Sequence, residues 1–255
     1  MISVTLSIPA VLAILLTMMI LLGSERAQAS LQPEIRRKLM HVSMGMLALS
    51  FPWIFSQYYH VWLLATLATL ALLTVRCTRL LKIRIGGAIH TICRKSYGEL
   101  CFPVAIATLY SLADGQLLLY MIPLLILTFA DSLAALVGVY YGRYRYQSPD
   151  GSKTLEGSFT MFIVSMGCVI VSLSISGLMA FETILLIAFN LAMVITLVEA
   201  ISWRGLDNFM IPVAGFFLLQ AYLPLNATDL ALYAVINSTF LVAVSLAQKR
   251  WPLRN

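Results

Sequence analysis

Charged residues are scarce in this sequence. Asp, Glu, Lys and Arg make up 11% of its 255 residues, whereas 60% are hydrophobic and the mean hydropathy is +0.90. A soluble domain of this size carries more charge on its surface than that. Apolar runs of about 20 residues, the length that crosses a bilayer as a helix, recur along the whole chain. A β-barrel would instead show short segments of alternating hydrophobicity. We therefore expect an all-α polytopic membrane protein, with residues 1–255 forming one domain.

Several common site signatures are also missing. The four cysteines form no CxxC pair and have no metal-ligand spacing, so buried or reduced thiols are expected. The chain contains no GxxxxGK(S/T), GxGxxG, HExxH or GxSxG motif, which excludes the usual nucleotide-binding and hydrolase signatures. The net charge of +6, in a membrane chain, indicates topology and contact with anionic lipid rather than nucleic-acid binding.

Nine apolar segments are expected to form helices. They cover about residues 2–22, 39–56, 60–75, 99–112, 117–141, 157–179, 183–202, 209–223 and 229–247. The segments at 99–112 and 209–223 are shorter than a full span, so we expect them to be half-spanning or strongly constrained. Between residues 76 and 96, basic and apolar residues alternate irregularly, which is typical of an interfacial helix or a basic surface loop.

The distribution of Lys and Arg supports this count of segments. The first, third, fifth and seventh connections hold four, six, three and one of them, and the C-terminal tail holds the remaining three of the 17. The even-numbered connections hold none. A wrong count would scatter basic residues over both faces. The positive-inside rule therefore predicts a cytoplasmic C-terminus, cytoplasmic basic loops and an N-terminus outside.

One acidic residue, Asp131, lies inside a segment that otherwise reads as a membrane helix. An ionisable group in the bilayer costs ~3 kcal/mol on insertion scales, so it is a functional candidate by default. Ala134, Gly138 and Gly142 follow at every fourth position and share a face that lets a helix or a ligand approach closely. Two structural alternatives stay open: Asp131 pairs with a Lys or Arg of another helix, and the small-residue face only packs helices.

Further polar candidates gather near the expected cytoplasmic face. Lys and Arg side chains can bind a polyphosphate, carboxylates can hold Mg²⁺, and a histidine can accept the proton of an attacking hydroxyl. Glycine amides at a helix start can approach phosphate oxygens. Arg36 is better explained as a plain end of the membrane segment. His41 as a satisfied core histidine, Glu99 as a helix cap and Asp207-Asn208 as a helix start remain alternatives.

Four sequence blocks resemble a known family. They are EIRRKLMH at 34–41 with Gly45, the Asp131–Gly142 pattern, KTLEGS at 153–158 with Phe162, and EAIS at 199–202 with GLDN at 205–208 and Pro212. Their order is similar to that in the CTP-dependent polyprenol and lipid kinases, which include dolichol kinase, phytol (farnesol) kinase and yeast-type diacylglycerol kinase. One departure is Ala130, where the family often has glycine before the aspartate.

The resemblance implies a kinase that uses CTP and Mg²⁺ to phosphorylate the hydroxyl of a membrane lipid, with the lipid tail beside the small-residue face. The implied catalytic residues are Asp131, His41, Lys38 and Arg37. Nucleotide binding is assigned to Lys153, Thr154, Glu156, Gly157, Ser158, Gly138 and Gly142. The metal is assigned to Asp131, Glu156 and Asp207, and Glu199, Asn208 and Glu99 complete the site.

Alternatives from other classes remain open. A cytidylyltransferase making a CDP-lipid would also use CTP, although its Lys-Arg and Lys-Asp signature is absent. A transporter and a structural membrane partner are the non-enzymatic alternatives. The alcohol is expected to be phytol, farnesol, a polyprenol or dolichol, or diacylglycerol. No transit peptide or long N-terminal extension is recognisable, so we expect a prokaryotic plasma membrane, or an endoplasmic-reticulum or plastid membrane in a eukaryote.

Overall fold

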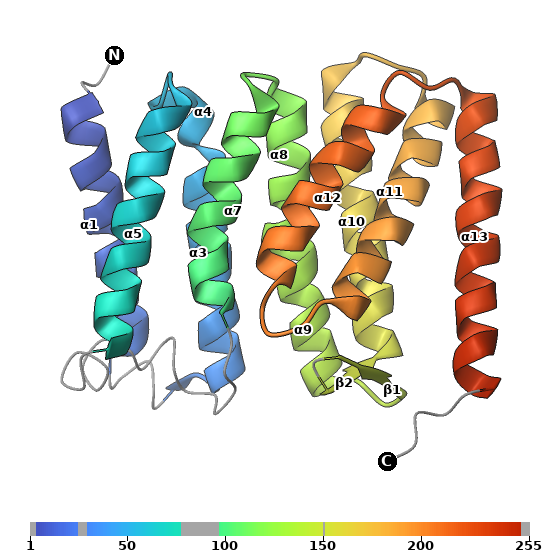
Figure 1. The fold of residues 1–255 in the computed structure, drawn as a ribbon, viewed down its shortest axis with the longest axis horizontal. Helices are drawn as coiled ribbons and strands as arrows, with labels where there is room; N and C mark the ends of the chain where they lie inside the picture. Colours follow the sequence, from blue (N-terminus) through green and yellow to red (C-terminus); the bar gives the residue numbers. More distant parts are fainter. Residues whose placement is uncertain (1–3, 25–29, 78–96, 150, 251–255) are drawn as a thin grey trace.

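The computed structural model describes residues 4–24, 30–77, 97–149 and 151–250 (Figure 1). Within these ranges all long elements are helices, and one short hairpin is the only sheet. The helices are α1 (Val4–Gly23), α3 (Pro33–Leu49), α4 (Phe51–Ile54), α5 (Tyr58–Cys77), α7 (Gly98–Ala113), α8 (Leu117–Leu125), η2 (Ile126–Ala130), α9 (Asp131–Tyr140), α10 (Leu155–Ser176), α11 (Phe181–Ile201), α12 (Asp207–Tyr222) and α13 (Ala227–Arg250). The strands are β1 (Arg145–Ser148) and β2 (Gly151–Thr154). The expected helical class is confirmed.

Each expected apolar segment coincides with helical structure to within a few residues, with one exception, and one expected loop also differs. The segment expected at 39–56 is instead α3, which begins six residues earlier at Pro33, followed by the short α4. Proline suits the first position of a helix because its fixed φ matches and its missing N–H would be unpaired there anyway. The polar loop expected after residue 142 contains the β1–β2 hairpin. The basic stretch expected at 76–96 lies outside the described residues from residue 78 onward.

Three helical stretches are long and apolar enough to cross a membrane: Leu117–Tyr140, Leu155–Ser176 and Phe181–Ile201. The first is continuous through α8, η2 and α9. α7 and α12 have 16 residues each and are shorter than a full span, as expected. The molecule is therefore a helical membrane protein, while the number of spans and the orientation stay predictions.

The helices stand side by side, and their connections alternate between the two ends of the bundle (Figure 1). The N-terminal ends of α3 and α7, the β hairpin and the α11–α12 connection lie together at one end. We call this end of the bundle the basic end, because α3, the hairpin segment and the α11–α12 connection carry Lys and Arg. The grouping of basic connections is the arrangement that the charge distribution predicted.

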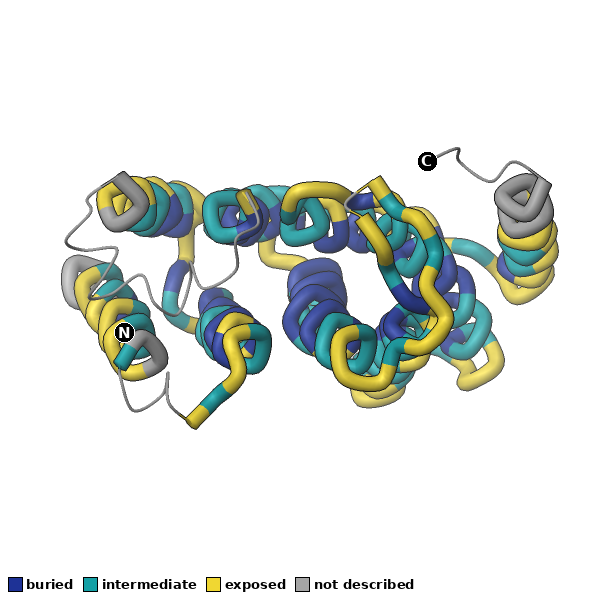
Figure 2. The backbone as a smooth tube through the Cα atoms, turned by 90° about the horizontal axis from the view of Figure 1, so that it is seen from below, coloured by how far each residue is buried: buried dark blue, intermediate teal, exposed yellow. Residues whose placement is uncertain are grey.

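The core lies in the middle of the bundle, and α13 lies at its edge (Figures 1 and 2). Leu109, Ile122, Met161 and Leu191 are completely buried, whereas most described side chains of α13 are exposed. In α11, Asn190 donates to the Leu230 carbonyl at 3.0 Å and accepts from Asn237 at 2.9 Å, which ties α13 to the bundle. Such interhelical hydrogen bonds contribute about 0.6 kcal/mol each in membrane proteins.

Candidate active site

A buried ion pair joins α3 to α9 near the basic end. Lys38 Nζ lies 2.6 Å from Asp131 Oδ2 and 3.2 Å from the Asp131 backbone oxygen. The two side chains are only 4% and 6% exposed. The interhelical partner that the sequence left open for Asp131 is therefore Lys38. Because a lone charge would be costly at this depth, each residue requires the other.

His41 extends this pair along the same face of α3. It follows Lys38 by three residues, so both side chains point toward Asp131. Its Nε2 lies 3.1 Å from the Leu127 carbonyl and 3.6 Å from Asp131 Oδ2. A hydrogen bond to a carbonyl requires the proton on Nε2, so in the neutral ring Nδ1 is the nitrogen that can accept a proton. The Phe102 ring packs edge-on against the imidazole, with 4.8 Å between centroids.

A π-helical turn, η2, immediately precedes Asp131. The widened turn presents the Leu127 carbonyl to His41, and π-turns occur frequently at functional sites. Gly45 of α3 packs against it closely: a Cβ at Gly45 would lie 2.6 Å from Thr128 Cγ2. The buried hydroxyls of Thr128 and Ser132 have no hydrogen-bond partner in the described part of the chain. Sequence reasoning missed this turn, and Pro123 within α8 was its one signal.

The β hairpin carries Lys153 to the end of α11. Lys153 pairs with Tyr146 in the antiparallel register, and its Nζ lies 2.5 Å from Glu199 Oε1. The same ammonium donates to the backbone carbonyl of Glu199, and cations near the last carbonyls of a helix are favoured by its dipole. Ser148 Oγ donates to the Ala200 carbonyl at 2.9 Å. Lys153 and Glu199, predicted from separate blocks, therefore meet in one ion pair.

Tyr146 connects the hairpin to α10. Its hydroxyl lies 2.7 Å from Ser158 Oγ. Burial raises the pKa of the Tyr146 phenol, and the negative charge of Glu199 raises it further, against the opposing effect of the Ser158 hydrogen bond. The phenol is therefore neutral near pH 7 and can donate or accept. Ser158 is held in place beside the hairpin by this contact.

The small-residue face of α9 packs against the first turn of α10. Thr154 caps α10 by accepting the Gly157 N–H at 3.2 Å. A Cβ at Gly142 would lie 2.9 Å from Thr154 Cβ, and a Cβ at Gly157 would lie 3.3 Å from Gly138 Cα. The lipid tail was expected beside this face; α10 packs against Gly138 and Gly142, and the place of the tail stays a prediction. Any nucleotide contact of these glycines stays a prediction.

The remaining acids form the rim of the site. Glu156 accepts the backbone N–H of Arg143 at 3.0 Å and of Tyr144 at 3.2 Å, which fixes the start of the hairpin segment. Asp207 begins α12 and accepts the Asn208 N–H at 2.9 Å. Its charge interacts with those of Asp131, Lys38 and Lys153. Asp207 therefore senses the charges of both ion pairs.

Two further predicted residues, Asn208 and Glu99, lie where α7 meets α12. The Asn208 side chain donates to the Gly98 carbonyl at 2.9 Å, which ties the start of α12 to the start of α7. Glu99 lies in the first turn of α7, next to that contact. Asn208 therefore has a clear positioning role, and the roles of both residues toward a substrate stay predictions.

Arg37 lies at the outer edge of the site. Its guanidinium makes two hydrogen bonds to Glu34, at 2.6 and 3.1 Å, and its side chain is 43% exposed. Its charge also interacts with Asp131 and Asp207. Arg36, for which a plain end of the membrane segment was favoured, is instead buried at 2% exposure because α3 continues through it.

Of the acids predicted to hold a metal, two have a free carboxylate oxygen among the described residues and one does not. Among the described residues, no group of three or more His, Cys, Asp or Glu side chains is close enough to hold a metal ion. Mg²⁺ in nucleotide sites needs only one or two carboxylates, since phosphates and water supply the rest. The Asp131 Oδ1 and Asp207 Oδ2 atoms accept no hydrogen bond within the described ranges. These two oxygens fit that pattern, whereas Glu156 is occupied by backbone amides.

Comparison with known proteins assigns a family. No family model matches the chain, and no solved structure has significant similarity to it. A protein from Synechocystis sp. named phytol kinase is 30% identical over 197 residues, which cover 75% of this chain and 81% of that protein. The similarity confirms the resemblance carried by the four sequence blocks. The chain belongs to the family of polyprenol and phytol kinases.

Proposed function

We propose that this protein is an integral-membrane kinase that transfers the γ-phosphoryl group of CTP to the hydroxyl of an isoprenoid alcohol. The relative named phytol kinase supports a phosphotransferase with an alcohol acceptor. The observation that carries the proposal is the buried cluster of Lys38, Asp131 and His41 near the basic end. A buried acid with a cation and an imidazole on one side is the set of groups that hydroxyl activation requires.

The acceptor hydroxyl binds at this cluster. His41 Nδ1 accepts the hydroxyl proton, because Nε2 already carries the proton that it donates to the Leu127 carbonyl. The alcohol oxygen then forms a bond to the γ-phosphorus, and the bond from that phosphorus to the β–γ bridging oxygen breaks. CDP leaves with the electron pair of that bond. Lys38 holds the Asp131 carboxylate in place throughout.

The donor phosphates bind above the cluster, between the hairpin and the first turns of α3. Lys153 and Arg37 are the cations that can turn from their carboxylate partners toward a triphosphate. Asp131 and Asp207 would hold Mg²⁺, which when bound neutralises charge on the β- and γ-phosphates. We assign the basic end to the cytoplasmic side, because CTP is supplied there and because basic connections favour that side.

The test uses purified full-length protein in lipid vesicles with γ-labelled CTP or ATP. The acceptors are phytol, farnesol, undecaprenol, dolichol and diacylglycerol, each offered separately. Label in a lipid phosphate, with release of CDP, supports the proposal and identifies the alcohol. Label that appears only in pyrophosphate indicates a cytidylyltransferase instead. Absence of turnover with every pair contradicts the kinase and makes transport the next activity to measure.

A further inference from the structure

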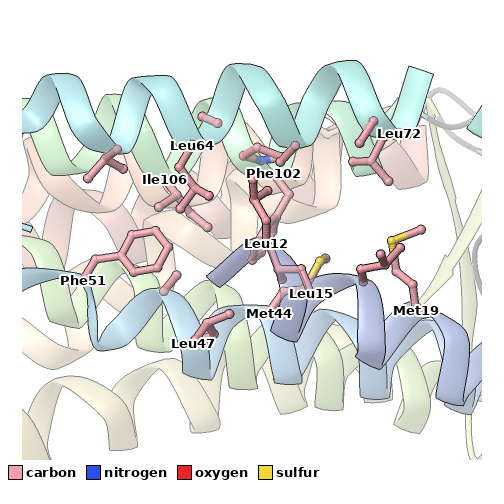
Figure 3. Close-up of a pocket in the computed structure, with 17 residues that line it drawn as sticks. Leu12, Leu15, Met19, Met44, Leu47, Phe51, Leu64, Leu72, Phe102 and Ile106 are labelled. Carbon is pink, nitrogen blue, oxygen red and sulfur yellow. The ribbon is translucent and has the colours of Figure 1, made fainter. Parts of the chain in front are cut away.

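An apolar pocket lies between α1, α3, α4, α5 and α7, outside the site described above (Figure 3). Its cavity volume is about 130 Å³, within an empty space of about 860 Å³ that is partly open to the surroundings. All of its lining side chains are apolar, including Leu15 of α1, Met44 of α3, Phe51 of α4, Ala68 of α5 and Phe102 of α7. A pocket of this kind binds hydrocarbon and offers no partner to a polar group.

The pocket adjoins the candidate active site. Phe102 lines the pocket and also packs against the His41 ring at 4.8 Å. Met44 follows His41 by three residues on α3, so the wall of the pocket starts one turn beyond the imidazole. One helix and one aromatic ring therefore connect the phosphorylation site to the hydrocarbon pocket.

The pocket is elongated along the helices. Its lining residues on α5 run from Val61 to Leu72, a rise of about 16 Å at ~1.5 Å per residue. From Met44 of α3 to Phe51 of α4 they run away from the basic end, whereas Met19 of α1 and Leu72 of α5 lie on the other side of Met44 and Phe102 (Figure 3). An extended hydrocarbon chain fits this elongated shape.

We propose that this pocket holds the isoprenoid tail of the alcohol substrate. The hydroxyl lies at Lys38, Asp131 and His41, and the tail runs from Phe102 toward Phe51. The inference rests on the proposed function, and it specifies the substrate as a single-chain alcohol of about phytol or farnesol length. Diacylglycerol has two chains and polar esters, and a dolichol chain is several times longer than the pocket. The face of α9 first expected to take the tail is filled by Thr154 and Gly157.

The direct test is photolabelling of the full-length protein in vesicles. The probe is a phytol analogue with a diazirine at the far end of its tail, and labelled peptides are identified by mass spectrometry. We expect labels on the pocket-facing residues of α1, α3, α5 and α7, which excess phytol removes. Labels on α9 and α10 would place the tail outside the pocket, and pocket labels that phytol does not displace would mean that bilayer lipid occupies it; either result would overturn the inference.

A kinetic test uses two variants of α5. Ala68→Phe fills the pocket, and Thr66→Phe adds a ring on the exposed side of the same helix as its control. We expect Ala68→Phe to raise KM for phytol and farnesol by about tenfold or more, since pocket shape discriminates to that extent. KM for CTP and for the short alcohol geraniol stays close to wild type. Equal kinetics of the two variants with phytol contradict the inference.

The two tests separate the pocket from the proposed function. Wild-type protein that phosphorylates no alcohol but is labelled in the pocket, with phytol competing, refutes the kinase and keeps the pocket as a lipid site. Wild-type protein that phosphorylates phytol while Ala68→Phe behaves as Thr66→Phe keeps the kinase and refutes the pocket. If Ala68→Phe does not fold, the labelling of wild-type protein decides alone.

Discussion

The buried pair of Lys38 and Asp131 yields the sharpest prediction. The pair is 2.6 Å long and its side chains are 4% and 6% exposed, so neither charge can be solvated when the other is removed. Replacing one partner of a buried pair costs about 3–5 kcal/mol, because an uncompensated charge is left behind. Removing both charges costs much less, since no buried charge remains.

The perturbation is a double-mutant cycle of Lys38→Met, Asp131→Asn and the combined variant. A loss of 3–5 kcal/mol corresponds to a decrease of roughly 6–20 °C in Tm for a chain of this size. We expect each single variant to decrease Tm by that amount and the double variant to decrease it less than either. Thermal unfolding in one detergent, followed by tryptophan fluorescence, measures all four proteins. Glu182→Gln, at an exposed acid of α11, is the matched control and stays near wild type.

Turnover measured on the same variants distinguishes a structural role of Asp131 from a catalytic one. If Asp131 orients the reacting hydroxyl, the double variant regains stability but not turnover, and kcat stays about 100-fold or more below wild type. Single variants that each melt within about 2 °C of wild type would refute the buried pair. A stable double variant with near-normal kcat would refute the catalytic assignment and leave a purely structural pair.

Three other predictions concern the glycine face, the donor site and the metal. Gly142→Ala should decrease the free energy of unfolding by about 1–3 kcal/mol, because the new Cβ would lie 2.9 Å from Thr154 Cβ. Gly167→Ala, which has open space around it, is the control and should not destabilise the protein. Equal Tm values for the two variants would contradict the packing of this face. Lys153→Gln should raise KM for CTP about tenfold, whereas Arg145→Gln on the same hairpin should change it little. Equal effects of the two variants would mean that the overall positive charge of the hairpin, not Lys153 itself, attracts the nucleotide. Chelation of divalent cations should abolish turnover and Mg²⁺ should restore it; turnover that persists in chelator would exclude the metal assignment.

The fold was largely predictable because two features of the sequence, the length of its apolar segments and the distribution of Lys and Arg, constrain how the helices are arranged. Apolar length determines where a helix can cross a bilayer, and the Lys and Arg distribution determines which connections share an end. The start of α3 was missed because the polar residues Glu34 to Lys38 carry no hydropathy signal. Their helical conformation depends on Pro33 and on contacts with α9 that no local pattern contains.

The candidate site was predictable by residue type but not by pairing. Lys38 and His41 lie on one face of α3 because they are three residues apart, and Asp131 was conspicuous as an acid in an apolar segment. The sequence does not reveal the register between helices, so it could not show that Lys153 reaches Glu199. Nor could it show the π-turn at η2 or the pocket beside Phe102, because both depend on how separate helices pack.

The pairing of charges also indicates how the site would work. In the described part of the chain, Arg37 pairs with Glu34, Lys38 with Asp131 and Lys153 with Glu199. Unpaired charge is costly near hydrocarbon, so a resting site neutralises its own cations. A triphosphate can replace the carboxylate partner of a cation only where water can also reach that cation. The exposed fraction of the side chain is 43% for Arg37, 19% for Lys153 and 4% for Lys38. Under the proposed function, the two accessible cations therefore suit exchange with the nucleotide, whereas Lys38 stays paired with Asp131 at the proposed alcohol site.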